Sequence, residues 1–441
     1  MIRHAHRLSL SLGLLLACND GSGDATSTND SATSTGDETG ENGDGDGDGD
    51  GDGDGDGDGD GDGDGDGDGD GHGWEHRIPN PDGDLTTSVT DIALMPDGGV
   101  VVVGSHQGPG MGQPRNEGFV RRLDADGAEL WTLMLTPDAE GYAYANAVET
   151  DPGGRIFVLT SNDAEPQPNA LAELDGDGDV VWETRSDELA FDLFLDAEGL
   201  WAGGGMAGAN PWIAHFDLDG LLVEAFTPPT STGGSGQVRA LHRSAEGTIY
   251  AVGLELEDLP GNPKHGFALA LDAAGATIWH DVVDPAMSSD SVMHDLTLAL
   301  DGDVVVVGEA RIQGPEVREL VLLRYAPDGT RRWEASWSGE GVPGVNEFEA
   351  GLHVEVGAND EIWAGGYRAV GGEGQLMALT RWTGEGALVD VSEWGHALNL
   401  TDRLEAFALV DNRIFLVGSW GTDDMFASEG WVACWELAAL P

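Results

Sequence analysis

The chain has 441 residues with 81 acidic and 20 basic side chains, which gives a formal net charge of −61 at pH 7. So negative a surface argues against nucleic acid and anionic membrane surfaces as partners, because both would repel it. It suits a soluble protein in salty surroundings, where counterions screen the repulsion between its own charges.

The N-terminus has the features of a targeting segment. A basic region precedes the apolar stretch 8–16, which is too short to span a bilayer core of about 30 Å. The stretch ends in Leu-Leu-Ala followed by Cys18, which resembles the lipobox of bacterial lipoproteins. The resemblance implies a signal peptide over residues 1–17 and a lipid anchor on Cys18. Asn19 replaces the aspartate that retains enteric lipoproteins in the inner membrane, so we expect an outer-membrane or cell-surface location.

The alternative is an ordinary signal peptide with a chance cysteine. If Cys18 is lipidated, Cys434 is the only other cysteine and the mature domain holds no intramolecular disulfide. Cys434 falls in a predicted strand, so we expect a buried, unreactive thiol.

Residues 18–71 are predicted to be a disordered spacer. The first part is rich in Ser, Thr, Asp and Gly, and Asp44–Gly71 alternates strictly between Asp and Gly. Glycine adds backbone entropy and aspartate adds repulsion, so the segment cannot build a core. It would lift a tethered domain clear of a lipid surface.

Calcium is the one cofactor that the sequence suggests. The tract ends in a pattern that satisfies the EF-hand loop D-x-D-x-D-G-x5-E. An alternating tract meets the first six positions at every Asp, and only its end supplies the final Glu, so the match is not specific. The ligands would be Asp64, Asp66, Asp68 and Glu75.

A unit of four short strands returns about every 45–50 residues from Thr87 to the end, which indicates a repeat architecture. Its clearest copies are 91–131, 238–279 and 294–333, in which apolar strands alternate with acidic-Gly turns. Four antiparallel strands per unit are typical of a β-propeller blade. The sequence therefore predicts an all-β, seven-bladed propeller over residues 72–441. The units begin near Thr90, Asn146, Phe191, Val238, His294, Leu352 and Leu404.

Units three and six are degenerate, which leaves six or eight blades as alternatives. Unit seven stops at Pro441 after three strands, whereas Asp70-Gly71 followed by Trp74 is similar to the end of a unit. We therefore predict that Trp74–Ile78 forms the outer strand of the last blade and closes the ring.

Tryptophans recur at one register, four residues after the turn glycine in the internal copies. Identical placement predicts identical packing between blades, so we assign a structural role to Trp74, Trp131, Trp182, Trp279 and Trp333. The better candidates for ligand contacts lie off this register: Trp201, Trp212, Trp337, Trp394 and Trp420.

The unit ending L-D-x-D-G-x-x-x-W resembles the quinoprotein-type (PQQ-like) propeller repeat and the repeats of large bacterial surface propellers. The resemblance covers residues 72–441 and implies the fold, but propellers host many activities. The adjacent cysteine pair of quinoprotein dehydrogenases is absent, so a quinone dehydrogenase is not expected.

We find no catalytic motif and expect no enzyme. One position at the start of the innermost strands carries polar groups, with Glu405 joining under one alignment and Ala147 and Ala240 in other units. Two interpretations stand: solvated strand starts that cap turns, or a cation or polar-ligand site around the channel mouth. The residues are Asp91, Asp192, Asp295 and His353. Ordinary surface or strand roles are assigned to His242, His280 and His294.

The longest connections are predicted to share one face, which makes that face the expected recognition surface. They are Ser105–Gly118, Glu255–His265, Ala310–Glu319, Ser419–Gly430 and the inter-blade link Thr227–Gly236. The sequence thus predicts a lipid-anchored extracytoplasmic module, monomeric, which binds or scaffolds an unknown protein or glycan. The alternatives are an envelope lyase or hydrolase acting at the channel mouth, and a structural protein of the surface or of envelope assembly.

Overall fold

The computed structural model describes most of the chain after residue 72. Cys18, the spacer and the aspartates of the calcium pattern lie outside the described residues. In the part that is described, no helix is long and apolar enough to cross a membrane. The described ranges are 73–81, 85–108, 115–135, 143–162, 169–205, 210–231, 233–257, 263–283, 290–311, 318–339, 348–370, 374–395, 400–422 and 427–440.

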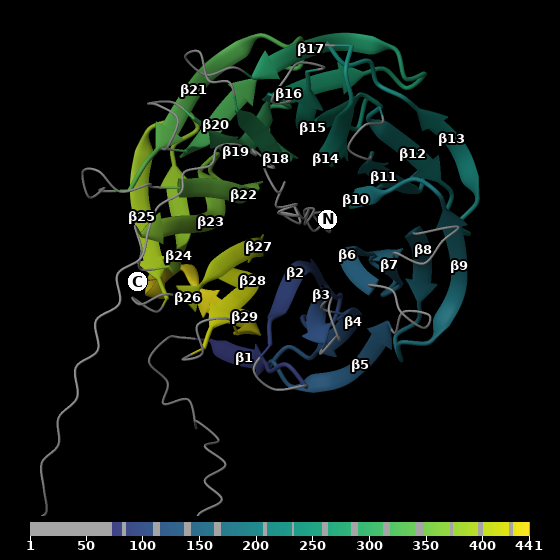
Figure 1. Ribbon diagram of the computed structural model, residues 1–441, viewed down its shortest axis with the longest axis vertical. Coiled ribbons are helices and arrows are strands. Elements are labelled where there is room, and N and C mark those ends of the chain that lie inside the picture. Colours follow the sequence, from purple (N-terminus) through teal and green to yellow (C-terminus); the bar gives the residue numbers. More distant parts are fainter. Residues whose placement is uncertain are drawn as a thin grey trace, which may run out of the picture. The chain divides into compact units, whose positions relative to one another are not determined.

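The strands form seven antiparallel sheets around a common centre, so the predicted seven-bladed propeller is confirmed (Figure 1). The first blade comprises β2 (Thr87–Leu94), β3 (Val100–Gly108), β4 (Arg115–Leu123) and β5 (Glu129–Leu135). The second comprises β6 (Ala143–Thr150), β7 (Ile156–Asn162), β8 (Asn169–Leu174) and β9 (Val180–Ser186). The third comprises β10 (Ala190–Leu195), β11 (Leu200–Gly204), β12 (Trp212–Phe216) and β13 (Leu222–Phe226).

The fourth blade comprises β14 (Gly236–Arg243), β15 (Ile249–Leu256), β16 (Lys264–Leu271) and β17 (Thr277–Val283). The fifth comprises β18 (Ser291–Leu298), β19 (Val304–Ala310), β20 (Glu319–Tyr325) and β21 (Arg331–Trp337). The sixth comprises β22 (Phe348–Val356), β23 (Ile362–Val370), β24 (Gly374–Trp382) and β25 (Leu388–Trp394), with the short β26 (Leu400–Thr401) beside β24.

The seventh blade closes the ring with strands from both ends of the chain. It consists of β27 (Arg403–Val410), β28 (Arg413–Gly421), β29 (Ser428–Glu436) and β1 (Trp74–Ile78). β1 pairs antiparallel with β29, from Trp74 opposite Cys434 to Ile78 opposite Gly430. The predicted closing strand is therefore confirmed with its predicted bounds, and the edge that an incomplete blade would expose is covered.

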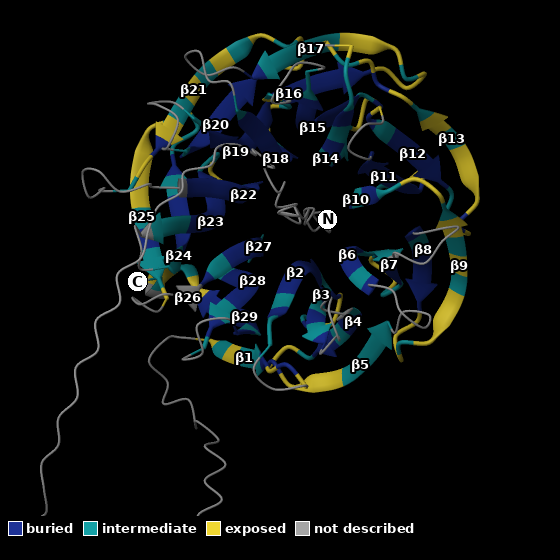
Figure 2. Ribbon diagram, in the orientation of Figure 1, coloured by how far each residue is buried: buried dark blue, intermediate teal, exposed yellow. Residues whose placement is uncertain are grey.

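Burial follows the position of a strand in its blade (Figure 2). Inner strands such as β19 are buried along their whole length, because neighbouring blades cover both faces of each sheet. Outer strands such as β21 alternate between exposed and half-buried residues. The continuous Val runs and the mixed outer strands in the sequence match these two environments.

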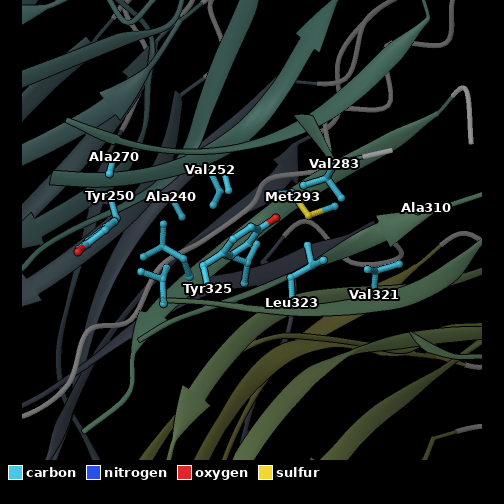
Figure 3. Close-up of a cluster of buried hydrophobic side chains, with 14 residues drawn as sticks. Ala240, Tyr250, Val252, Ala270, Val283, Met293, Ala310, Val321, Leu323 and Tyr325 are labelled. Carbon is cyan, nitrogen blue, oxygen red and sulfur yellow. The ribbon is translucent and has the colours of Figure 1, made fainter. Parts of the chain in front are cut away.

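Apolar clusters between neighbouring blades make up the core. Figure 3 shows one of them, in which side chains of the fourth blade meet those of the fifth. Tyr250 and Val252 lie on one side, and Leu323 and Tyr325 lie on the other. Each blade thus buries its faces against its neighbours, as a repeat architecture requires.

The register tryptophans lie between the outer edges of the blades. The Trp131 ring covers Gly178 so closely that a Cβ there would contact it, and the φ of 86° at Gly178 also favours glycine. The Trp131 indole N–H donates to the Gly176 carbonyl at 2.9 Å. Unit three lacks this tryptophan, and Phe226 covers Gly275 instead. The rings of Trp74, Trp182, Trp279 and Trp333 lie over Gly127, Gly220, Gly329 and Gly386.

The two ends of the propeller differ in their connections. The first strand of each blade is linked to the second by a tight turn, and in six blades a similar turn joins the third strand to the fourth. The strand ends between the second and third strands of a blade, and those between consecutive blades, lie at the opposite end of the sheets, which we call the loop-bearing end. The strand ends that flank the two classes of long connection therefore share one face, in agreement with the sequence prediction.

Candidate functional site

Each innermost strand carries a β-bulge at the same position near the loop-bearing end. In every case one residue of the innermost strand has no paired residue on the second strand of its blade. A bulge re-aims its extra residue, and the innermost strands surround the centre of the ring (Figure 1). The seven bulged residues, one per blade, form what we call the axial ring: Thr90, Asn146, Phe191, Arg239, His294, Leu352 and Glu405.

The residue after the bulge is the position at which the sequence suggested a channel-mouth site. Asp91, Asp192 and Asp295 are at most 1% exposed, and each binds the next blade rather than solvent. One oxygen of each carboxylate accepts a backbone N–H from the neighbouring innermost strand, at 2.7–2.9 Å. Burial raises the pKa of Asp91 well above its usual range. The donors are Val148, Leu241 and Val354.

His353 occupies the same position in the sixth blade and joins this network. Its Nδ1 lies 2.9 Å from Asp295 Oδ2, and its Nε2 lies 3.8 Å from Glu355 Oε1. Burial alone would lower the pKa of His353, but the two carboxylates outweigh it and raise that pKa to about 10. The ring is therefore cationic at neutral pH and links the fifth and sixth blades.

Glu405 does not belong to this set. The bulge in β27 falls between Leu404 and Ala406, so Ala406 is the equivalent of Asp91 and Glu405 is a member of the axial ring. Among the described residues, no group of three or more His, Cys, Asp or Glu side chains is arranged to hold a metal ion. Glu75, the last residue of the calcium pattern, lies in β1 opposite Ala433.

The axial ring is chemically asymmetric. In the first two blades the bulged residues bind backbone: the Thr90 hydroxyl lies 3.0 Å from the Ala145 carbonyl, and the Asn146 amide donates to the Ala190 carbonyl at 3.2 Å. These two side chains tie neighbouring blades together. The remaining five blades contribute one aromatic, one apolar and three ionisable side chains.

Arg239 and His294 come from the fourth and fifth blades. The Arg239 guanidinium lies over the Phe191 ring, 4.9 Å from its centroid. Burial lowers the pKa of Arg239 to about 10, which leaves it charged at neutral pH. Burial, reinforced by nearby cations, lowers the pKa of His294 well below its usual value, so this ring is neutral.

A second group of ionisable side chains adjoins the ring. The Arg403 guanidinium lies 4.5 Å from the centroid of Tyr367, and its Nε lies 3.3 Å from Glu405 Oε1. Arg318 contacts Glu309 and, at 2.9 Å, Asp290 Oδ2. Burial raises the pKa of Glu309, of Glu405 and of Tyr367. Together with Arg239 and His294, these groups form an axial charged cluster contributed by blades four to seven.

The off-register tryptophans are spread over several blades, and two of them share one aromatic cluster. Trp201 is 1% exposed and its ring stacks on His215, so it belongs to the core between the third and fourth blades. Trp337 is buried with blades five and six. Trp212 is half-buried beside blades two and three. Trp394 and Trp420 are half-buried at the edge of one aromatic cluster around Trp431.

Sequence reasoning missed the axial charged cluster. His294 was assigned an ordinary role, and Arg239 was not singled out. The signal was present one residue away, since the repeat that aligns Asp91, Asp192 and Asp295 also aligns the position before it. The pattern of residues does not show the bulge, so nothing in the sequence marks that position as the one released from strand pairing.

Comparisons with known proteins add the fold and no more. No protein-family model matches the chain, and no curated protein does either. BamB from Moraxella catarrhalis is 16% identical with a TM-score of 0.42, over 84% of this chain and 98% of that one. Sqt1 from Chaetomium thermophilum is 14% identical with a TM-score of 0.44, over 83% and 99%. Extracellular domains 1-2 of Drosophila Semaphorin 1a are 8% identical with a TM-score of 0.50, over 82% and 88%.

Proposed function

We propose that this protein is a lipid-anchored extracytoplasmic binding module, without catalytic activity, that recognises its ligand at the axial ring of the loop-bearing end. The observation that supports the proposal is the asymmetry of that ring. Thr90 and Asn146 hold blades together, whereas the other five blades place Phe, Arg, His, Leu and Glu at the equivalent position. If this position served only to stabilise the fold, we would expect the same type of residue to recur there in every blade.

The anchor is proposed from the lipobox resemblance at Cys18. We expect the wild-type chain to partition into detergent and to sediment with the cell envelope. The Cys18→Ser variant should keep the propeller and lose that partitioning. If both chains sediment alike after extraction with high salt, the lipid anchor is refuted. Protease accessibility on intact cells then separates an outer surface location from the inner leaflet.

Binding is tested with the full chain and a panel of defined soluble saccharides and peptides, neutral, acidic and basic. The readout is a concentration-dependent rise in melting temperature, because a ligand that binds the folded state stabilises it. Phe191→Ala should abolish the shift. The matched control is Leu300→Ala, which removes a 70% exposed side chain at the opposite end. Equal loss in both variants, or no shift with any probe, would contradict the proposal.

A second candidate is an envelope enzyme of the lyase or hydrolase type. It is favoured by the neutral His294 beside Arg239 and the carboxyl groups of Glu309 and Glu405, a combination that can move a proton at a polarised bond. The assay follows the appearance of new reducing ends from each saccharide of the binding panel. Release that disappears in His294→Ala would establish the enzyme and displace the binding module.

A further inference from the structure

We propose that the axial charged cluster binds an anionic group of the ligand, a carboxylate or a sulfate-type oxyanion, with Arg239 and Arg403 as its principal contacts. This inference rests on the proposed function, because it names the ligand class that the axial ring would recognise. The positions of the cations, their exposure and the state of the neighbouring acids each support it.

Basic side chains are scarce in this protein, and several of them gather here. The chain has 20 Lys and Arg against 81 acids. Four of the 20 lie close enough to His294 to lower its pKa, and they come from blades four, five and seven. They are Arg239, Lys264, Arg318 and Arg403.

The arginine side chains are largely enclosed and retain some exposure, although the Nε atoms of Arg239 and Arg403 are buried. The side chains of Arg403 and Arg318 are 20% and 19% exposed, and Arg239 is half-buried. A partly desolvated guanidinium interacts more strongly with an anion than one in bulk water. Its planar fork of donors matches the two oxygens of a carboxylate or sulfate. The Arg239 guanidinium also lies 4.9 Å from the centroid of the Phe191 ring, a favourable cation–π contact.

The acids of the cluster oppose a bound anion less than their number suggests. Burial raises the pKa of Glu309 and of Glu405, so their charged forms are disfavoured relative to exposed carboxylates. Glu405 and Glu309 are also paired with arginines, Arg403 and Arg318. Glu309 and Glu405 therefore oppose a bound anion less than exposed carboxylates would, and Asp290 is paired with Arg318 at 2.9 Å.

The test is titration calorimetry of the full chain with sodium sulfate, sodium D-glucuronate and methyl glucoside, at an ionic strength held constant with sodium chloride. We expect the two anions to bind and the neutral sugar to bind more weakly or not at all. Arg239→Gln and Arg403→Gln should each weaken anion binding at least about tenfold, as expected for loss of a charge-assisted contact. The control Arg185→Gln removes the same charge from a 52% exposed side chain and should change affinity less than about twofold.

Sulfate binding alone would assign a small oxyanion, and glucuronate binding alone would assign a carboxylate-bearing sugar. The inference is overturned if neither anion binds the wild type, or if Arg185→Gln weakens binding as much as Arg239→Gln. Melting curves without ligand identify any variant that fails to fold. If one of Arg239→Gln and Arg403→Gln does not fold, the affinity of the other variant decides the test. If neutral probes bind and Phe191→Ala abolishes their binding, while neither anion binds, the proposed binding module is supported and the proposed anion site is refuted.

Discussion

The buried histidine between the fifth and sixth blades should govern how stability depends on pH. Replacing His353 by Gln removes a cation that is 1% exposed and lies 2.9 Å from Asp295 Oδ2. Asp295 also accepts the Val354 N–H, and Glu355 accepts the Leu409 N–H at 3.1 Å, so both carboxylates remain in place when the cation is lost. Breaking a buried pair in this way costs about 3–5 kcal/mol.

The pH dependence gives an independent magnitude. The pKa of His353 is about 10 in the folded protein and 6.5 when unperturbed. A raised histidine pKa stabilises the folded state fully below pH 6.5, and the contribution is lost as the pH rises towards 10. At about 1.36 kcal/mol per pH unit, the difference between these values corresponds to on the order of 5 kcal/mol. The two routes agree in size.

The assay is urea unfolding of the wild type and His353→Gln at several pH values between 6 and 10. The difference in unfolding free energy should be largest near pH 6 and should shrink between pH 6.5 and about 10, where the histidine is neutral in the unfolded chain but still protonated in the folded wild type. Leu352→Ala is the control, because it removes a neighbouring buried side chain that does not titrate. A His353→Gln difference that stays constant across this range would refute the buried ion pair.

Three further results are expected. Deleting the chain through residue 71 should leave the melting temperature unchanged, whereas deleting it through Ile78 should lower it sharply by removing β1; equal melting would refute ring closure as a source of stability. Gly178→Ala should cost about 1–3 kcal/mol in urea unfolding, since its φ is 86° and its Cβ would meet the Trp131 ring. Gly176→Ala in the same turn, with open space around it, should cost much less. Calcium titrated against chelator should not move the melting temperature, because the channel-mouth aspartates already bind backbone N–H groups; a clear rise would place a cation site in the propeller.

The fold could be predicted from the sequence because each blade repeats the same local chemistry. Apolar strands alternate with acidic-Gly turns, and this alternation specifies four strands per unit. A tryptophan at constant spacing packs on the turn glycine of the next blade, which repeats the same contact around the ring. Even the closing strand was predictable, because the last unit lacks a fourth strand and the segment that begins at Trp74 has the features of one. Pairing the two ends of the chain accounts for both observations. Repetition makes such inferences strong, because one error would have to recur in every copy.

The site could be predicted only in part, for the opposite reason. The aligned aspartates were visible, but their interpretation depended on the direction in which the innermost strand presents them. A bulge shifts that direction by one residue, and no residue type is required at a bulged position, as Thr90, Phe191 and Arg239 show. From the sequence, the aligned aspartates could be either strand-start caps or a channel-mouth site, and the structure shows them buried against the next blade, one residue after the bulge.

That single-residue offset separates two kinds of work in the propeller. Where it carries Asp or His, the position after the bulge holds neighbouring blades together, through Asp91, Asp192, Asp295 and the His353 cation. Thr90 and Asn146 do the same from the bulged position in the first two blades. The bulged position itself is released from the ladder, so its side chain can vary without breaking strand pairing. A change at Arg239 should therefore alter binding more than stability, while a change at Asp192 should do the reverse. If Asp192→Ala weakened anion binding as much as Arg239→Gln while leaving unfolding unchanged, this division of roles would be wrong.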